Sequence, residues 1–174
     1  MQKSYTKENL IVIDRYISSF SKNVVLRGTD LTIPEIISVA RKNATVNLTK
    51  DKTILKRIKN CYEKMMEDVK DGLPIYGTNT GYGARATHIV TNEIEQERLA
   101  LARKVSEAIS HTDVSVGPLF EKDVVRAAML IRINMLLRGG SAVKLEDLEI
   151  YRKMLNKNIT PIVNQYGGIG ASGD

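Results

Sequence analysis

Residues 121–139, EKDVVRAAMLIRINMLLRG, form a helical pattern that is apolar nearly all round. A helix without a continuous polar face is typical of the inside of a helical bundle, because a surface helix needs one side that faces water. Arg138 closes the apolar run, and Gly139 and Gly140 follow it as helix stop signals. The segment therefore predicts a mainly α fold built around this helix.

Further helices are predicted on both sides of this segment, together with short strands near the start of the chain. Apolar residues recur at three- and four-residue spacing over residues 51–70, which indicates an amphipathic helix. Thr32 can cap another short helix, because Pro34 and Glu35 both favour a first helical turn. The remaining predicted elements are helices at about 10–20, 93–109 and 145–157 and strands at 24–26 and in ATVNLT (44–49).

The composition is that of a globular protein and favours neither nucleic acid nor a membrane as a partner. Apolar residues make up 43% and charged residues 26% of the 174 residues. The net charge of +6 comes from lysines and arginines interleaved with acidic residues, and no tryptophan is present to stack on bases. The single cysteine, Cys61, and a start without a signal-peptide pattern fit a cytoplasmic protein. We expect Cys61 to be a core or half-buried helix residue.

A first glycine-rich break interrupts the helical pattern at residues 71–86, DGLPIYGTNTGYGARA. It lacks the phosphate-loop signature, and no strand of a parallel sheet precedes it. Tyr76 stands before Gly77, and Asn79, Thr80 and Tyr82 lie between further glycines. The glycines give a loop the freedom to close over a site, and a tyrosine supplies a titratable hydroxyl. A tyrosine with its ordinary pKa of about 10 needs nearby positive charge or hydrogen-bond donors to act as a base.

A second break, GGIGASGD at residues 167–174, has two interpretations. In the first, the amide nitrogen of Gly173 attacks the carbonyl of Ala171, and loss of the Ser172 hydroxyl as water leaves a methylidene on a five-membered ring. That product is a strong electrophile, which the twenty standard side chains do not provide. In the second interpretation the stretch is a flexible tail, and the triplet by itself favours this one.

The two breaks together resemble a known family. YGTNTGYG (76–83) and GGIGASGD (167–174) are similar to the tyrosine loop and the cofactor-forming segment of the aromatic amino-acid ammonia-lyases and 2,3-aminomutases. The resemblance runs from about Leu31 to Asp174 and includes SHTDVSVGPLFEKDVVRAAMLIRINMLLRGGSAV and NITPIVNQYGGIGASGD. It implies the mainly α ammonia-lyase fold of the fumarase/aspartase-like superfamily. An N-terminal extension would cover residues 1–30, and an N-terminal lyase domain with short strands and a mobile tyrosine loop would cover 31–174.

The resemblance also implies a self-made cofactor and a catalytic base. In the family, an Ala-Ser-Gly triplet cyclises autocatalytically to 4-methylidene-imidazol-5-one, so Ala171, Ser172 and Gly173 are the expected precursor residues. Asp174 matches the acidic residue that assists cyclisation, and Tyr76 matches the loop tyrosine that removes the substrate β-proton. The cofactor makes the substrate nitrogen a better leaving group, and no metal is expected.

Three further residues are expected at the substrate. Gly83 either contacts the substrate through its backbone or only keeps the loop flexible, and both interpretations stay open. The pair Ser110-His111 stands where histidine ammonia-lyases and tyrosine aminomutases carry Ser-His, which favours a polar substrate ring. Gly168 replaces a serine that many relatives carry, and His88 is expected to be an exposed loop residue.

The resemblance therefore implies a carbon–nitrogen lyase that eliminates ammonia from an aromatic L-amino acid, with tyrosine or histidine favoured and phenylalanine as a further option. One alternative is a 2,3-aminomutase that gives a β-amino acid, and another is an inactive N-terminal fragment or a non-enzymatic helical module. Family members are longer than 174 residues. The expected partners are thus the C-terminal remainder of the enzyme and identical subunits in a homotetramer.

Overall fold

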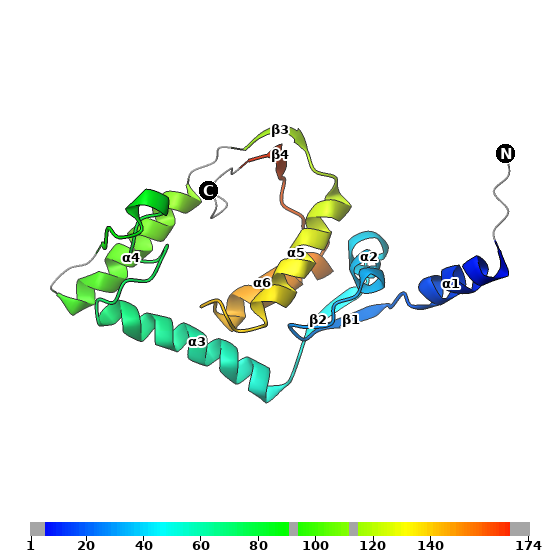
Figure 1. Ribbon diagram of the computed structural model, residues 1–174, viewed down its shortest axis with the longest axis horizontal. Helices are drawn as coiled ribbons and strands as arrows, with labels where there is room; N and C mark the ends of the chain where they lie inside the picture. Colours follow the sequence, from blue (N-terminus) through cyan, green and yellow to red (C-terminus); the bar gives the residue numbers. More distant parts are fainter. Residues whose placement is uncertain (1–5, 91–93, 112–114, 168–174) are drawn as a thin grey trace. The chain divides into compact units, whose positions relative to one another are not determined.

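The computed structural model describes residues 6–90, 94–111 and 115–167 (Figure 1). In chain order the elements are α1 (Lys7–Ser18), β1 (Asn23–Leu26), α2 (Ile33–Lys42), β2 (Thr45–Leu48), α3 (Lys52–Lys70), the 3-10 turn η1 (Gly83–Arg85), α4 (Glu95–Ser110), β3 (Val116–Leu119), α5 (Lys122–Leu136), α6 (Leu145–Asn156) and β4 (Asn164–Tyr166). The helices and the two early strands predicted from the sequence are confirmed, with ends shifted by a few residues. β3 and β4 were not predicted. Within the described ranges no helix is long and apolar enough to cross a membrane.

The chain forms two compact units. One unit comprises residues 1–58 and 121–161, and the other comprises 59–120 and 162–174. The predicted boundary between residues 30 and 31 is a different division of the chain, based on resemblance, and it stays a prediction.

In the first unit, β1 and β2 form a parallel pair, and α2 makes the crossover between them. The register pairs Val24 with Val46 and Leu26 with Leu48. α2 begins with the predicted cap: Thr32 Oγ1 accepts the Glu35 N–H, and the Glu35 carboxylate accepts the Thr32 N–H in return. A capped helix between parallel strands is the crossover connection that such a pair requires.

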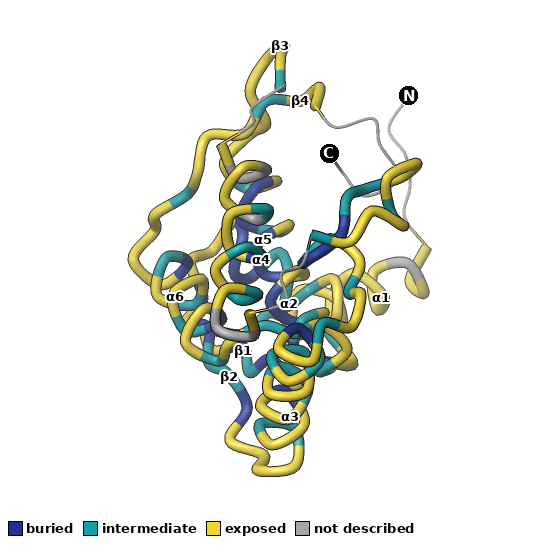
Figure 2. The backbone as a smooth tube through the Cα atoms, turned by 90° about the vertical axis from the view of Figure 1, so that its left-hand side faces the viewer, coloured by how far each residue is buried: buried dark blue, intermediate teal, exposed yellow. Residues whose placement is uncertain are grey.

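The core of this unit is built on α5, which packs against α2 and α6, while α6 packs against β2. Figure 2 shows the buried stretches of these elements. The buried apolar side chains of the core are Val24, Leu26, Val39, Ala44, Val46, Ile58, Val125, Met129, Leu130, Ile133, Leu137, Leu148 and Leu155. α5 is not buried all round as its sequence predicted, because Val124 is 46%, Ile131 39% and Met135 53% exposed. In the described part of the chain, neighbouring elements therefore cover one side of α5.

Arg126 of α5 is a buried cation that bonds to the C-terminal ends of two neighbouring helices. Its residue is 2% exposed. Nη2 and Nε donate to the carbonyls of Val39 and Ala40 in α2 at 2.9 and 3.3 Å, and Nη1 donates to the Leu155 carbonyl in α6 at 3.1 Å. The Val39 and Ala40 carbonyls lie in the last turn of α2, where no helical N–H reaches them, whereas the Leu155 carbonyl also accepts the Asn158 N–H at 3.1 Å. Burial lowers the pKa of the Arg126 guanidinium, while the negative ends of the two helix dipoles favour its charge.

Two asparagine side chains also join elements that are distant in sequence. Asn156, the last residue of α6, accepts the Val46 N–H at 2.8 Å and donates to the Val46 carbonyl at 2.9 Å, as a neighbouring strand would do for β2. Asn134 of α5 accepts the Gly28 N–H at 2.9 Å. Gly28 has a φ of +85°, and a Cβ there would lie 3.0 Å from the backbone of Leu137, so only glycine fits this approach.

The second unit contains the C-terminal part of α3, the loop that follows it, α4, and the β3–β4 pair. Arg98 of α4 donates to the Lys70 carbonyl at the end of α3. β3 and β4 run antiparallel, with Val116 opposite Tyr166 and Leu119 opposite Asn164. β4 thus ends one residue before the second glycine-rich break.

Replacement of Arg126 by methionine is expected to destabilise the fold. The methionine fills much of the same volume but leaves the Val39 and Ala40 carbonyls without their donor and the Leu155 carbonyl with one bond fewer, at a cost of about 3 kcal/mol. Chemical denaturation measures this loss. Arg132→Met changes an exposed arginine of the same helix and is expected to stay within about 0.5 kcal/mol of the original protein. Equal stability of the two variants would contradict the assignment.

Candidate active site in the tyrosine loop

The loop that carries Tyr76 begins where α3 ends and closes on itself. Gly72, with a φ of +78°, turns the chain away from the helix. Further on, an isolated antiparallel bridge pairs Thr80 with Ile89. The Gly81 N–H donates to the His88 carbonyl at 3.1 Å, and the Val90 N–H donates to the Asn79 carbonyl at 2.7 Å. The glycine-rich break is therefore a hydrogen-bonded loop with a short 3-10 turn at its far end.

Tyr76 lies on the exposed side of this loop, with its hydroxyl held by the backbone. Tyr76 is 54% exposed to solvent. The Gly83 N–H donates to Tyr76 Oη at 3.2 Å. The Tyr76 ring meets the Tyr82 ring edge to face, with 5.7 Å between the ring centroids. A backbone N–H aimed at a phenol oxygen favours the deprotonated form, which is the form that acts as a base.

Positive backbone angles at two glycines make this contact across seven residues possible. Gly77 has a φ of +74°, and Gly83 has a φ of +53°. A Cβ on Gly77 would lie 3.1 Å from Cε1 of Tyr82, whereas a Cβ on Gly83 would meet nothing within 4 Å. Gly77 is thus required both for its conformation and for the approach of Tyr82, and Gly83 for its conformation alone.

The structure brings together two of the predicted site residues, Tyr76 and Gly83. Ser110 is the last residue of α4, and the exposed His111 follows it, with its N–H bonded to the Glu107 carbonyl at 3.2 Å. The predicted cofactor precursor Ala171, Ser172 and Gly173, with Asp174 and Gly168, lies outside the described residues. Their roles, and those of Ser110 and His111, stay predictions.

Two minor expectations are confirmed, and one set of residues was missed. His88 is an exposed loop residue, and Cys61 is half-buried in α3. Asn79 and Thr80 are 2% and 1% exposed, so they are buried polar residues inside the loop. The sequence offered only their position between glycines as a signal, which does not distinguish a buried amide from an exposed one. Among the described residues no group of three His, Cys, Asp or Glu side chains is arranged to hold a metal.

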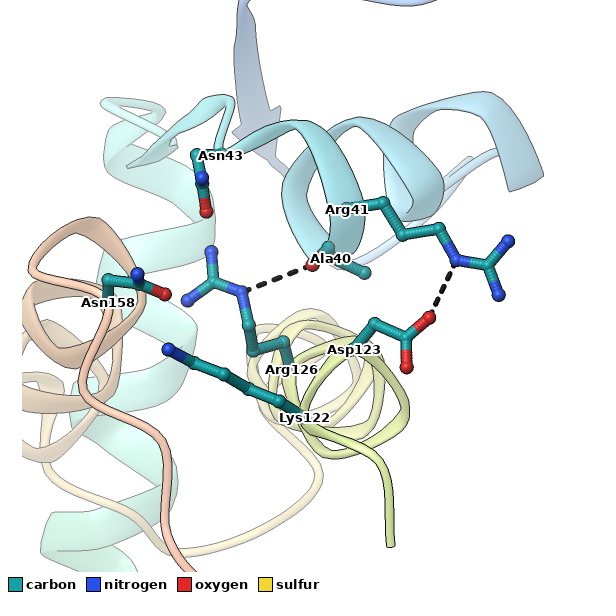
Figure 3. A pocket seen from close by; sticks show the side chains of 7 residues that line it. All are labelled: Ala40, Arg41, Asn43, Lys122, Asp123, Arg126 and Asn158. Carbon is teal, nitrogen blue, oxygen red and sulfur yellow. Dashed lines mark hydrogen bonds and ion pairs between the residues drawn. The ribbon is translucent and has the colours of Figure 1, made fainter.

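A hollow in the first unit gathers several charged side chains (Figure 3). Its volume is about 350 Å³, and its lining residues are Ala40, Arg41, Asn43, Lys122, Asp123, Arg126 and Asn158. Arg41 Nε and an Asp123 carboxylate oxygen form an ion pair at 2.6 Å on one side of it. The bond from Arg41 lowers the pKa of Asp123 below its usual 3.8. With Arg126 bonded to helix carbonyls, these contacts hold the start of α5 against the end of α2.

The Asp123 ion pair makes a small pH-dependent contribution to stability. A carboxyl whose pKa is lower in the folded than in the unfolded chain stabilises the fold above the unfolded value of 3.8. This contribution is lost as the pH falls through the folded pKa. Urea unfolding at decreasing pH is therefore expected to show Asp123→Asn as less stable at pH 7 and converging on the original protein as the pH falls below 3.8. Asp14→Asn, at an exposed carboxylate of α1, is the control and is expected to show no such convergence.

Comparisons with known proteins identify a family and several relatives that match most of this chain. The family model "Aromatic amino acid lyase" matches residues 31–174. A histidine ammonia-lyase of Treponema denticola is 39% identical over 153 residues, which are 88% of this chain and 29% of that protein. A tyrosine 2,3-aminomutase of Chondromyces crocatus is 32% identical over 149 residues, 86% of this chain and 27% of that protein.

The backbone fold is also similar to that of a solved structure. The tyrosine aminomutase from Streptomyces globisporus superimposes with a TM-score of 0.70 at 30% identity, over 84% of this chain and 26% of that one. The chain thus spans less than a third of the length of these relatives.

Proposed function

Because the chain belongs to the aromatic amino acid lyase family, we propose that it is the N-terminal part of an enzyme that eliminates ammonia from an aromatic L-amino acid. The family and the mainly α lyase fold expected from the two glycine-rich motifs are confirmed by the family match and the aminomutase superposition. The activity is our proposal. The observation that supports it best is the contact between Tyr76 Oη and the Gly83 N–H.

Tyr76 acts as the base in this proposal. The Gly83 N–H is a hydrogen-bond donor on the phenol oxygen, and such a donor stabilises phenolate over phenol. The exposed position of Tyr76 leaves its oxygen accessible to a substrate. The phenolate takes the β-proton of the bound amino acid, which general base catalysis requires at hydrogen-bond distance.

The electrophile expected in this family would be made by the chain itself. Ala171, Ser172 and Gly173 fit it chemically, because two small residues flank the serine whose hydroxyl leaves as water. Once cyclised, these residues would supply an electrophile for the substrate amine, which would make the nitrogen a better leaving group. Asp174 assists its formation in this proposal, and no metal takes part.

Ser110 and His111 would select the substrate ring. A histidine side chain can hydrogen-bond a phenol oxygen or an imidazole nitrogen, so tyrosine and histidine are the favoured substrates, and phenylalanine is a third. Relatives named as histidine ammonia-lyases support histidine among these substrates. The relative named as a tyrosine 2,3-aminomutase supports a second candidate function, return of the amine to the β-carbon. In this proposal a C-terminal part, as in the longer relatives, completes the active enzyme, which assembles as a homotetramer.

Formation of the electrophile is testable by mass. The protein is expressed with any sequence that continues beyond Asp174, as the original and as Ser172→Ala. The original is expected to weigh about 36 Da less than its sequence mass, through loss of two waters, and to absorb in the near ultraviolet. Ser172→Ala has no hydroxyl to lose, so it cannot form the methylidene and is expected to lack the near-ultraviolet absorption and at least one of the two water losses. An original protein of unaltered mass would contradict the cofactor proposal.

The role of Tyr76 is testable by kinetics on the same protein. Incubation with tyrosine, histidine and phenylalanine identifies the substrate through an absorbing unsaturated acid, and a β-amino acid product instead identifies an aminomutase. Tyr76→Phe removes the base and is expected to lower kcat by about 100-fold or more, with a smaller change in KM. Tyr151→Phe, at an exposed tyrosine of α6, is the control. Full activity of Tyr76→Phe would exclude this residue as the base.

A further inference from the structure

Asn79 holds the backbone on the N-terminal side of Tyr76. Its side chain is a buried amide, since the residue is 2% exposed. Asn79 Oδ1 accepts the Ile75 N–H at 2.7 Å, and Asn79 Nδ2 donates to the Leu73 carbonyl at 2.9 Å. One amide therefore satisfies both a donor and an acceptor of the segment that leads into Tyr76. A buried amide bonded at both ends fixes the backbone it contacts, because breaking either bond leaves a buried polar group unpaired.

Thr80 holds the backbone on the other side of Tyr76. Thr80 is buried, with 1% of its surface exposed to solvent. Thr80 Oγ1 accepts the Gly77 N–H at 3.1 Å and donates to the Gly81 carbonyl at 2.9 Å. The residues directly before and after Tyr76 thus each give their N–H to a buried side chain.

Tyr82 completes the turn and directly precedes Gly83, whose N–H donates to the Tyr76 hydroxyl. Its hydroxyl donates to the Gly77 carbonyl at 3.0 Å, and its ring packs edge to face on the Tyr76 ring. The next residue is Gly83, whose N–H donates to Tyr76 Oη at 3.2 Å. The contact between the proposed base and its donor is therefore the outer end of a hydrogen-bonded turn that Asn79 and Thr80 close from inside.

We propose that Asn79 and Thr80 are positioning residues, which hold the turn in the conformation that places the Tyr76 hydroxyl on the Gly83 N–H. The loop then brings an assembled base to the substrate, instead of a flexible tyrosine that must find its donor after binding. The inference deepens the proposed function and rests on the role of Tyr76 in it. A misplaced catalytic group lowers the turnover rate strongly and weakens substrate binding only a little, because its geometry matters most in the transition state.

The first test measures the turn without any catalysis. Hydrogen–deuterium exchange is followed by mass spectrometry at the amides of Ile75, Gly77 and Gly83 in the protein expressed with any continuing sequence. Thr80→Val is expected to speed exchange at Gly77 and Gly83, because it removes the hydroxyl and keeps the shape. Thr80→Ser keeps the hydroxyl and is expected to preserve slow exchange. Unchanged exchange at Gly83 in Thr80→Val would overturn the proposal.

Asn79 is tested in the same way with an isosteric change. Asn79→Leu fills the volume of the amide but bonds neither the Ile75 N–H nor the Leu73 carbonyl. Exchange at Ile75 and at Gly83 is expected to become faster. Thr78→Val is the matched control for both positions, because Thr78 directly precedes Asn79 and its side chain takes no part in these bonds. Equal exchange in Asn79→Leu and Thr78→Val would overturn the role of Asn79.

The second test measures turnover. Thr80→Val and Asn79→Leu are expected to lower kcat by about ten- to a hundredfold with KM changed by less than about threefold. Thr80→Ser is expected to restore most of kcat, and Thr78→Val to retain it. A loss confined to KM, or a loss in Thr80→Ser equal to that in Thr80→Val, would overturn the positioning role.

The two tests separate failure of this inference from failure of the proposed function. If the original protein forms no product from any aromatic amino acid, the proposed function fails, and the exchange measurement still decides whether Asn79 and Thr80 hold the turn. If the original protein is active and Tyr76→Phe is inactive, unchanged kcat in Thr80→Val and Asn79→Leu overturns the positioning role alone.

Discussion

The charge of Arg126 is the constraint on which the first unit depends. A guanidinium that is 2% exposed must find its hydrogen bonds inside the protein, and the unit offers carbonyls at the C-terminal ends of α2 and α6. The hydrogen bonds of Arg126 thus fix the positions of the C-terminal ends of α2 and α6 against α5. The apolar core alone would tolerate sliding of α2 along α5, because hydrophobic contact has no direction. Three directed bonds from one side chain remove that freedom.

The same device operates in the second unit on a smaller scale. Asn79 and Thr80 sit where a loop of this composition would expose its backbone to water, and their side chains take the place of that water. The glycines and the buried polar side chains have complementary effects. Positive φ angles at Gly77 and Gly83 allow the chain to fold back, and the internal bonds then hold the folded conformation. A loop rich in glycine is therefore not necessarily loose, since what matters is whether its polar backbone groups have partners.

The helices could be predicted from the sequence, and many of the contacts between them could not. Thr32 and Glu35 form a capping box whose two members lie three residues apart, so the start of α2 is visible in a short window of sequence. β3 and β4 have four and three residues and lie about 45 positions apart in the chain, so no short window of sequence predicts that they pair. Arg126 reads as a break in an apolar run, because periodicity gives no information on which carbonyls a buried cation will meet. The site roles of Tyr76 and Gly83 come from family resemblance and stay predictions, whereas the burial of the Asn79 amide depends on the folded path of the loop and has no local signal.

The short distance in sequence between Tyr76 and Gly83 has a consequence for how the proposed base works. A phenol needs a stabilising donor to act near neutral pH, and a donor from another element would have to be brought into register each time the loop moved. Here the donor belongs to the same hydrogen-bonded turn as the base, seven residues along the chain. The pair can therefore move with the loop as one body, and its geometry does not depend on where the loop stands relative to the rest of the protein. In the proposed function, movement of the loop controls the access of Tyr76 to the substrate, while the turn keeps the Gly83 N–H on the phenol oxygen.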